Sequence, residues 1–134
     1  MEFDVQGQVD HWWRSAEEEF EFVDHAFLWR KPRQAMFHAH LSLEMALKAS
    51  VCSFLKDVSP KIHDLVRLAQ IAQLPISDNQ KRFLGKMNQY NITGRYTNPL
   101  PQEPTHEEAA QLIQTSKEFV KWLKPVLFKA SDAI

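Results

Sequence analysis

His40, Glu44 and Lys48 recur at intervals of four in the middle of the chain. Residues four apart share one face of an α-helix, so these imidazole, carboxylate and ammonium groups would form a single stripe. The stripe could be a solvated helix face with a supporting Glu-to-Lys pair, or a polar seam that faces a groove or a second subunit. A second polar group follows at His63 and Asp64, where Asp64 favours the positive end of a helix and His63 can turn inward.

Six histidines invite a metal site, but their spacing does not favour one. His38 and His40 are two residues apart and point in different directions on a helix, while His40 and Glu44 supply at most two ligands from one face. No serine lies in a Gly-x-Ser-x-Gly turn, and no glycine-rich phosphate loop or dinucleotide fingerprint occurs. We therefore expect no metal, no cofactor and no nucleophilic serine chemistry.

The elements that must hold these residues are helical. Apolar residues recur at helical spacing, and capping and proline signals divide the chain into five segments. The expected helices cover residues 9–29, 32–56, 59–75, 77–91 and 105–124. Their boundaries rest on Pro32 and Pro60 in first turns, a cap at Ser59, capping boxes at Ser77–Gln80 and Thr105–Glu108, and Pro125, which should kink or end the last helix.

The composition is that of a globular helical domain. The 134 residues are 44% hydrophobic and 25% charged, and three glycines are too few for a sheet with tight hairpins. We predict an all-α, up-and-down bundle of four to five helices in which the first two form a long antiparallel hairpin. One domain should occupy residues 1–134, with its core at about 9–128. The core stripe of the second helix should be Met36, Ala39, Leu43, Leu47, Val51 and Phe54.

Charge distribution and cysteine usage indicate possible partners and the cellular location of the protein. Residues 1–29 hold eight acidic residues and one arginine, whereas residues 30–100 hold eleven basic and four acidic residues. These halves could complement each other within the chain, or the basic part could meet phosphates. The single Cys52 should be packed in a helix, and neither a signal peptide nor a membrane span is visible. We expect a cytoplasmic protein without membrane contact.

Four segments together resemble the HEPN family of small helical domains, and the resemblance covers roughly residues 10–125. They are Trp12-Trp13-Arg14-Ser15-Ala16, the helix from Phe37 to Ala49, Lys61-Ile62-His63-Asp64-Leu65, and Arg95-Tyr96. The second is similar to the family's Phe-x-x-Gln-x-x-x-Glu-x-x-x-Lys-Ala helix, with His40 in place of glutamine. Each motif is weak alone, and their order and spacing make the resemblance specific.

The resemblance implies a bundle similar to nucleotidyltransferase substrate-binding domains, commonly homodimeric and encoded beside a minimal nucleotidyltransferase, sometimes as a toxin–antitoxin pair. Family ribonucleases carry Arg-x(4–6)-His, but here Leu100, Pro101 and Gln102 stand where histidine should follow Arg95. The same spacing occurs from Arg33 to His38 and His40, at the wrong place in the fold. Enzymatic activity is therefore not favoured.

The function expected from this resemblance is a module that holds a nucleotide or RNA phosphate. Its expected ligand-binding residues are Arg95, Tyr96, Lys48, Glu44, His40, His63 and Asp64. The alternatives are a metal-independent ribonuclease toxin and a purely structural interaction subunit for a nucleotidyltransferase. In a homodimer, Trp12 or Trp13 with Phe37 would line the interface.

Overall fold

A computed structural model describes residues 4–91 and 103–132, and within these ranges it contains five α-helices, one 3-10 helix and no strand. The all-α prediction is therefore confirmed. The elements in chain order are α1 (Val5–Leu28), α2 (Pro32–Leu55), α3 (Leu65–Ile71), α4 (Asp78–Met87), the 3-10 helix η1 (Asn88–Tyr90) and α5 (His106–Asp132).

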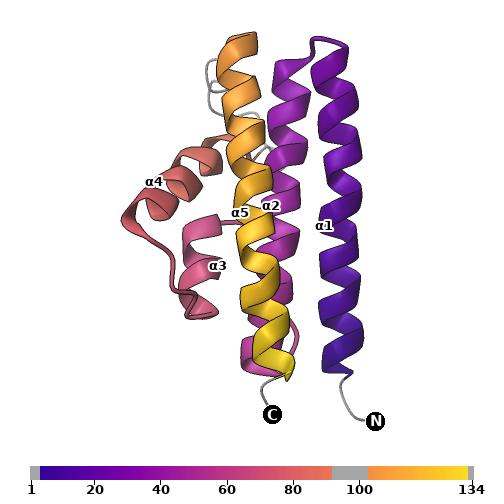
Figure 1. The fold of residues 1–134 in the computed structure, drawn as a ribbon, viewed down its shortest axis with the longest axis vertical. Helices are drawn as coiled ribbons and strands as arrows, with labels where there is room; N and C mark the ends of the chain where they lie inside the picture. Colours follow the sequence, from indigo (N-terminus) through magenta and orange to yellow (C-terminus); the bar gives the residue numbers. More distant parts are fainter. Residues whose placement is uncertain (1–3, 92–102, 133–134) are drawn as a thin grey trace.

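Helices α1 and α2 form the long antiparallel hairpin that the sequence predicts (Figure 1). A tight turn joins them, in which Arg30 has a left-handed backbone and Pro32 opens α2 at its first turn. Small buried residues such as Ala16 and Ala39 allow a close approach, and the hydroxyl of Ser42 donates to the carbonyl of Ala16 at 2.8 Å. This hydrogen bond fixes the two long helices in register.

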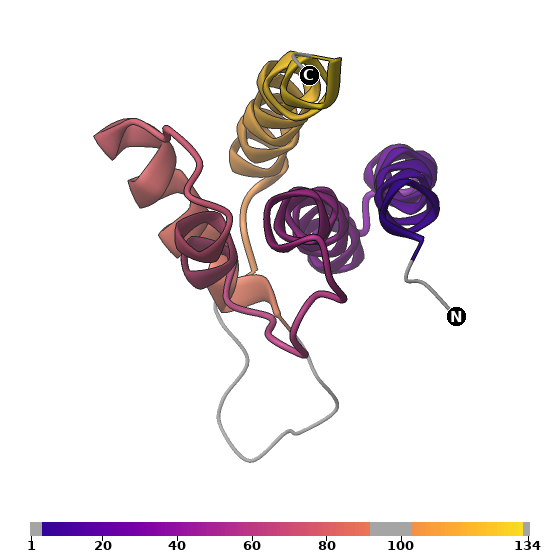
Figure 2. The same cartoon turned by 90° about the horizontal axis from the view of Figure 1, so that it is seen from below.

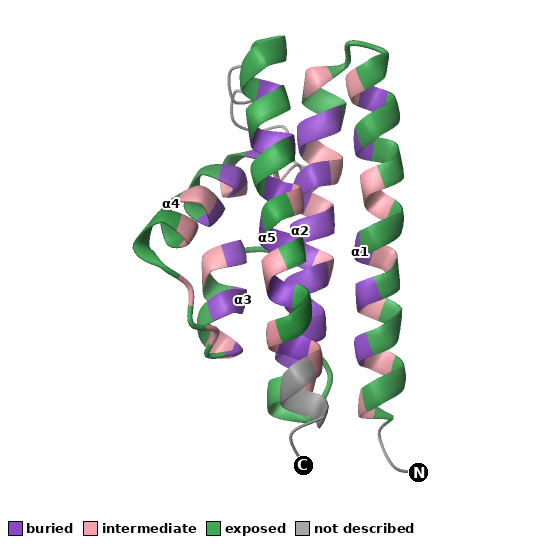
Figure 3. Cartoon of the chain, viewed as in Figure 1, coloured by how far each residue is buried: buried purple, intermediate pink, exposed green. Residues whose placement is uncertain are grey.

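Helix α2 is the centre of the fold, with α1, α5 and α3 around it (Figure 2). Fourteen of its residues are buried, so its surface is covered on nearly every side (Figure 3). Cys52 is fully buried as expected, and burial raises the pKa of its thiol. A helix that is buried on several sides can hold polar side chains away from water, and α2 buries His40, Glu44 and Lys48 in this way.

The predicted starts of α4 and α5 are correct and the start of α1 differs, and each has a visible cause. Both capping boxes form: the side chains of Ser77 and Gln80 exchange bonds with each other's backbone N–H, and Thr105 and Glu108 do the same. Helix α1 begins four residues earlier than expected, because the Asp4 carboxylate accepts from the N–H of Gly7 and caps it.

Three expectations about the elements are wrong. Helix α3 begins at Leu65 rather than at Ser59, because Asp64 caps it and Ser59 turns its hydroxyl to the carbonyl of Pro60. It also ends at Ile71, before the expected stop at Pro75. Helix α5 continues through Pro125 to Asp132, where residues beyond the proline, such as buried Leu127, still pack on the core. Phe54, expected in the core, is 46% exposed near the end of α2.

Within the described ranges, no helix is long and apolar enough to cross a membrane.

Candidate functional site

The predicted stripe on α2 lies inside the protein. His40, Glu44 and Lys48 are 2%, 5% and 7% exposed, so the interpretation of a solvated face is wrong. Helix α1 lies along one side of α2, and the segment that leads into α3 covers another. Four-residue spacing correctly predicts that the three side chains share a face, whereas their burial depends on what packs over that face.

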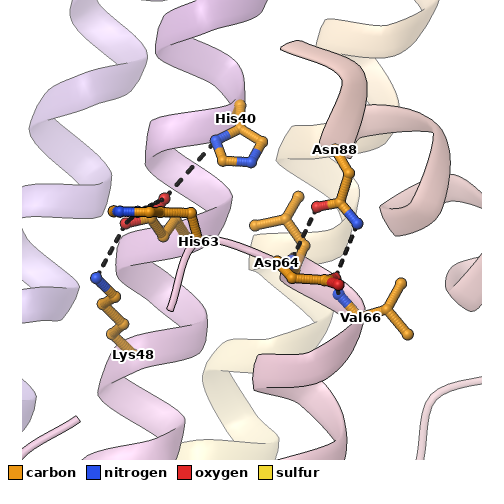
Figure 4. A network of polar contacts seen from close by, with 8 residues as sticks. His40, Lys48, His63, Asp64, Val66 and Asn88 are labelled. Atoms are coloured by element: carbon orange, nitrogen blue, oxygen red, sulfur yellow. Dashed lines mark hydrogen bonds and ion pairs between the residues drawn. The ribbon is translucent and has the colours of Figure 1, made fainter. Parts of the chain in front are cut away.

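Glu44 is the centre of the polar cluster, because its carboxylate lies near His40, Lys48 and His63. These three partners are labelled in Figure 4. Its carboxylate oxygen Oε2 lies 3.0 Å from Nζ of Lys48, and its Oε1 lies 3.8 Å from Nδ1 of His40. The ammonium group of Lys48 also lies over the ring of Trp12, 5.3 Å from the ring centroid. The buried carboxylate and the buried ammonium therefore neutralise each other, and Trp12 shields the cation.

His63 reaches the same carboxylate from the segment before α3. Its Nδ1 lies 3.1 Å from Oε2 and 3.2 Å from Oε1 of Glu44, while 47% of its side chain is exposed. An ionised carboxylate accepts hydrogen bonds, so Nδ1 must carry the proton that it donates to Glu44. The neutral imidazole then has its lone pair on Nε2. The expected inward turn of His63 is thus correct for one edge of the ring only.

His40 is neutral at physiological pH. Burial lowers its pKa to about 4, because a charged imidazole is poorly solvated there, and the nearby Glu44 carboxylate offsets only part of this effect. Its Nε2 has no hydrogen-bond partner among the described residues. His40 therefore adds a polar edge to the cluster and no charge.

Asp64 acts on the backbone of α3. Its carboxylate accepts from the N–H groups of Val66 at 3.0 Å and Arg67 at 3.2 Å, and from the side-chain amide of Asn88 at 2.9 Å. The amide oxygen of Asn88 in turn accepts from the N–H of Leu65 at 2.8 Å. These bonds start α3 immediately after His63 and so fix the position of His63.

The structure brings five of the seven predicted ligand-binding residues into one region: His40, Glu44, Lys48, His63 and Asp64. Arg95 and Tyr96 belong to residues 92–102, which lie outside the described ranges. Among the side chains that the structure describes, no group of three or more His, Cys, Asp or Glu is arranged to hold a metal ion.

One participant in the cluster was missed from the sequence, and one of the two tryptophans offered for a dimer interface is buried within this chain. Asn88 carried no local signal, since its role depends on α4 and η1 returning beside α3. Trp13 was one of two alternatives for a dimer interface, and it is buried in the core of this chain, against Phe128. Trp12, its neighbour, is half-buried over Lys48.

The fold and the cluster together define a helical bundle with a buried acid that positions a partly exposed histidine. The family model described as HEPN domain matches residues 9–126, and the chain belongs to the HEPN family. Comparisons with curated proteins and with solved structures gave no match.

Proposed function

We propose that this HEPN-family chain binds a phosphate group of a nucleotide or of RNA at the open edge of His63. The observation that carries the proposal is the Glu44–His63 pair: a buried carboxylate holds Nδ1 at 3.1 Å while nearly half of the imidazole is exposed. A histidine held in one orientation binds an anion with little loss of side-chain freedom. When protonated, its Nε2–H becomes a charge-assisted donor to phosphate.

The other groups have separate roles in this proposal. Lys48 and Glu44 are buried against each other, so they position His63 and do not contact the ligand. Exposed Lys61, two residues before His63, adds positive charge nearby. Arg95 and Tyr96 are proposed as further phosphate contacts on the strength of the sequence resemblance.

Ligand-dependent stabilisation tests this proposal. The melting temperature of the full chain is measured with ATP, GTP and a short single-stranded RNA, for the wild type, His63→Ala and the surface control Lys81→Ala. Binding at about one hundred times Kd stabilises a protein by about 2.7 kcal/mol, so the wild type and the control should shift clearly and His63→Ala should shift less. An equal shift in all three proteins, or none at millimolar ligand, would reject the site.

Metal-independent RNA cleavage is the second candidate, and the same pair favours it. With Nδ1 protonated and held by Glu44, Nε2 of neutral His63 is free to accept a proton from a ribose 2′-hydroxyl. The 2′-oxygen would then attack phosphorus and the bond to the 5′-oxygen would break, with the leaving oxygen taking a proton from water. RNA that stays intact after long incubation with concentrated protein and chelator would exclude this activity.

Assembly with a second copy and with a minimal nucleotidyltransferase, as in a toxin–antitoxin pair, is proposed from family membership alone. Sedimentation of the isolated chain tests the homodimer, and co-purification with the product of an adjacent gene tests the partner. A monomeric chain that co-purifies with no nucleotidyltransferase would count against both.

A further inference from the structure

A second feature lies at the tip of the α1–α2 hairpin, where aromatic rings from both helices line an open groove. Phe22, His25 and Trp29 come from α1 and its end, and Lys31, Gln34 and His38 come from the turn and the start of α2. The groove encloses about 450 Å³. This volume is within the roughly 300–1,000 Å³ of typical small-molecule sites.

The rings in this tip groove are already arranged in pairs. Phe22 stacks on His38 with centroids 5.3 Å apart and planes 22° apart, and His25 lies 5.7 Å from Trp29 at 34°. His38 is held from behind by Glu19, whose Oε2 is 2.6 Å from its Nδ1. Phe22 and Trp29 nevertheless remain 55% and 68% exposed. Their ring faces are therefore oriented and available for a planar ligand.

Positive charge lies at the turn end of the tip groove. Arg30, Lys31 and Arg33 are exposed, no acidic residue occurs between Asp24 and Glu44 in the sequence, and the described residues show no ion pair to these three cations. Asp24 is engaged by Lys117 at 2.8 Å.

Among the acidic residues of α1, Glu19 is paired with His38, which lines the groove, and others lie in a different groove. Glu17 and Glu21 line a different groove, between α1 and α5, where Lys121 and Lys124 also lie. Glu18 is one helical turn before Phe22, toward the middle of the hairpin. A bound anion is therefore favoured at the turn and disfavoured toward Glu18.

We propose that the tip groove binds a nucleoside phosphate, with the base stacked on Trp29 and the Phe22–His38 pair and the phosphate beside Arg30 and Lys31. Aromatic faces accept any base by stacking, and flanking cations hold the backbone, which is how single-stranded nucleic acids are bound without sequence readout. The ligand can be a free mononucleotide or one nucleotide of an RNA strand. Its chemical class rests on the proposed function, whereas its residues are separate from the His63 cluster.

A second copy of the chain fits this groove less well. A symmetric dimer contact through the tip would bring Arg30, Lys31 and Arg33 against the same three cations of the other copy, and like charges across an interface repel. An anionic ligand meets complementary charge instead.

Tryptophan fluorescence of the full chain tests the inference, because a base that stacks on exposed Trp29 quenches its emission. AMP and a single-stranded hexaribonucleotide are titrated into the wild type, Trp29→Ala, Arg30→Gly and Leu28→Ala, and affinities are confirmed by calorimetry. Arg30→Gly removes a charge at a left-handed position that glycine favours, so it spares the fold. Leu28→Ala is the matched control, since Leu28 is 73% exposed and does not line the groove.

Saturable quenching is expected in the wild type and Leu28→Ala, with affinity at least about tenfold weaker in Trp29→Ala and several-fold weaker in Arg30→Gly. Equal affinity for AMP and the hexamer would assign a mononucleotide site, and a hexamer that binds at least about tenfold tighter would assign RNA. Both results support the inference.

Unchanged affinity in Trp29→Ala, or no saturable binding of either ligand at millimolar concentration, would overturn it. So would a Trp29→Ala variant that changes the oligomeric state and leaves nucleotide affinity intact, which would assign the tip to protein contact. His63→Ala separates the two proposals. Quenching of Trp29 should survive in that variant, and its loss would overturn a separate tip site. A number of binding sites, measured by calorimetry, that is the same in His63→Ala and in the wild type counts against the proposed function alone.

Discussion

His63 Nδ1 lies 3.1 Å from Oε2 of Glu44, which joins a half-exposed imidazole to a buried carboxylate on the central helix. The same oxygen lies 3.0 Å from Nζ of Lys48, so one buried acid serves a buried cation and a surface-reaching histidine. Removing the acid would therefore affect both the stability of the core and the position of the histidine.

The buried ion pair makes a coupled contribution to stability. Glu44→Gln leaves the Lys48 ammonium buried without its anion, and breaking such a pair costs about 3–5 kcal/mol in the free energy of unfolding. The double variant Glu44→Gln/Lys48→Met removes both charges and should recover about 2 kcal/mol relative to the sum of the single changes. Urea denaturation gives the free energy of unfolding of the wild type, Glu44→Gln, Lys48→Met and the double variant. Strictly additive single effects would show that the two groups are not coupled.

Stability should fall on acidification because of His40. Its pKa is lowered to about 4 in the folded state by burial, against about 6.5 in the unfolded chain. Between these values the unfolded state binds more protons, so the free energy of unfolding decreases as the pH falls from 6.5 to 4, by about 3 kcal/mol in total. Glu44, His63 and Asp64 face His40 and are present in both proteins compared below.

His40→Gln provides the control for this pH effect. Glutamine keeps a polar side chain without a proton equilibrium in this range. The difference in stability between the wild type and His40→Gln should therefore change with pH between 6.5 and 4 and stay constant from pH 7 to 8. A difference that is the same at pH 5 and pH 7 would contradict the assigned cause.

Asp64 should act as a helix cap and not as a ligand. Asp64→Ala is expected to lower the free energy of unfolding by about 1 kcal/mol, because two backbone N–H groups of α3 lose their acceptor. Asp64→Ser keeps a capping oxygen and should retain both stability and nucleotide affinity. Loss of affinity in a stable Asp64→Ser protein would instead place Asp64 in the binding site, as the sequence interpretation had it.

Pro125 should be a weak point of α5. Proline in a helix interior removes one backbone hydrogen bond and crowds the preceding turn, and the residue is exposed, so its side chain adds little packing. Pro125→Ala is expected to raise the free energy of unfolding by about 2 kcal/mol, after allowing for the greater freedom of the unfolded chain. A lower melting temperature in Pro125→Ala would show that α5 needs the proline.

The helices were predictable because each carries a repeated apolar spacing and most carry a local start signal. The start of α3 was not, because Ser59 and Asp64 both have capping side chains. Asn88 lies in a later element and hydrogen-bonds to both Asp64 and Leu65, so it favours Asp64 as the cap of α3. Continuation of α5 through Pro125 was likewise a tertiary effect, since the core contacts of Leu127 outweigh the local cost of proline.

The sequence predicted which residues lie together in the site, but it did not predict that they are buried. Four-residue spacing places His40, Glu44 and Lys48 on one face, but the same spacing serves a solvated surface. Their burial follows from α2 being enclosed by α1, α3 and α5, which no local pattern encodes. The tip groove was missed although the sequence held a signal for it. Phe22 and Trp29 lie off the apolar stripe of α1 that includes Trp13, Ala16 and Val23, and both are exposed.

The most direct test of phosphate binding at His63 observes its ring nitrogens. Long-range proton–nitrogen NMR spectra of the full chain, with histidines assigned by single substitutions, are recorded as AMP or a short RNA is added. The expected result is that Nε2 of His63 shifts saturably toward its protonated value while Nδ1 stays protonated and His40 does not move. A His63 signal that is unchanged at a ligand concentration that saturates the protein would contradict the proposed site.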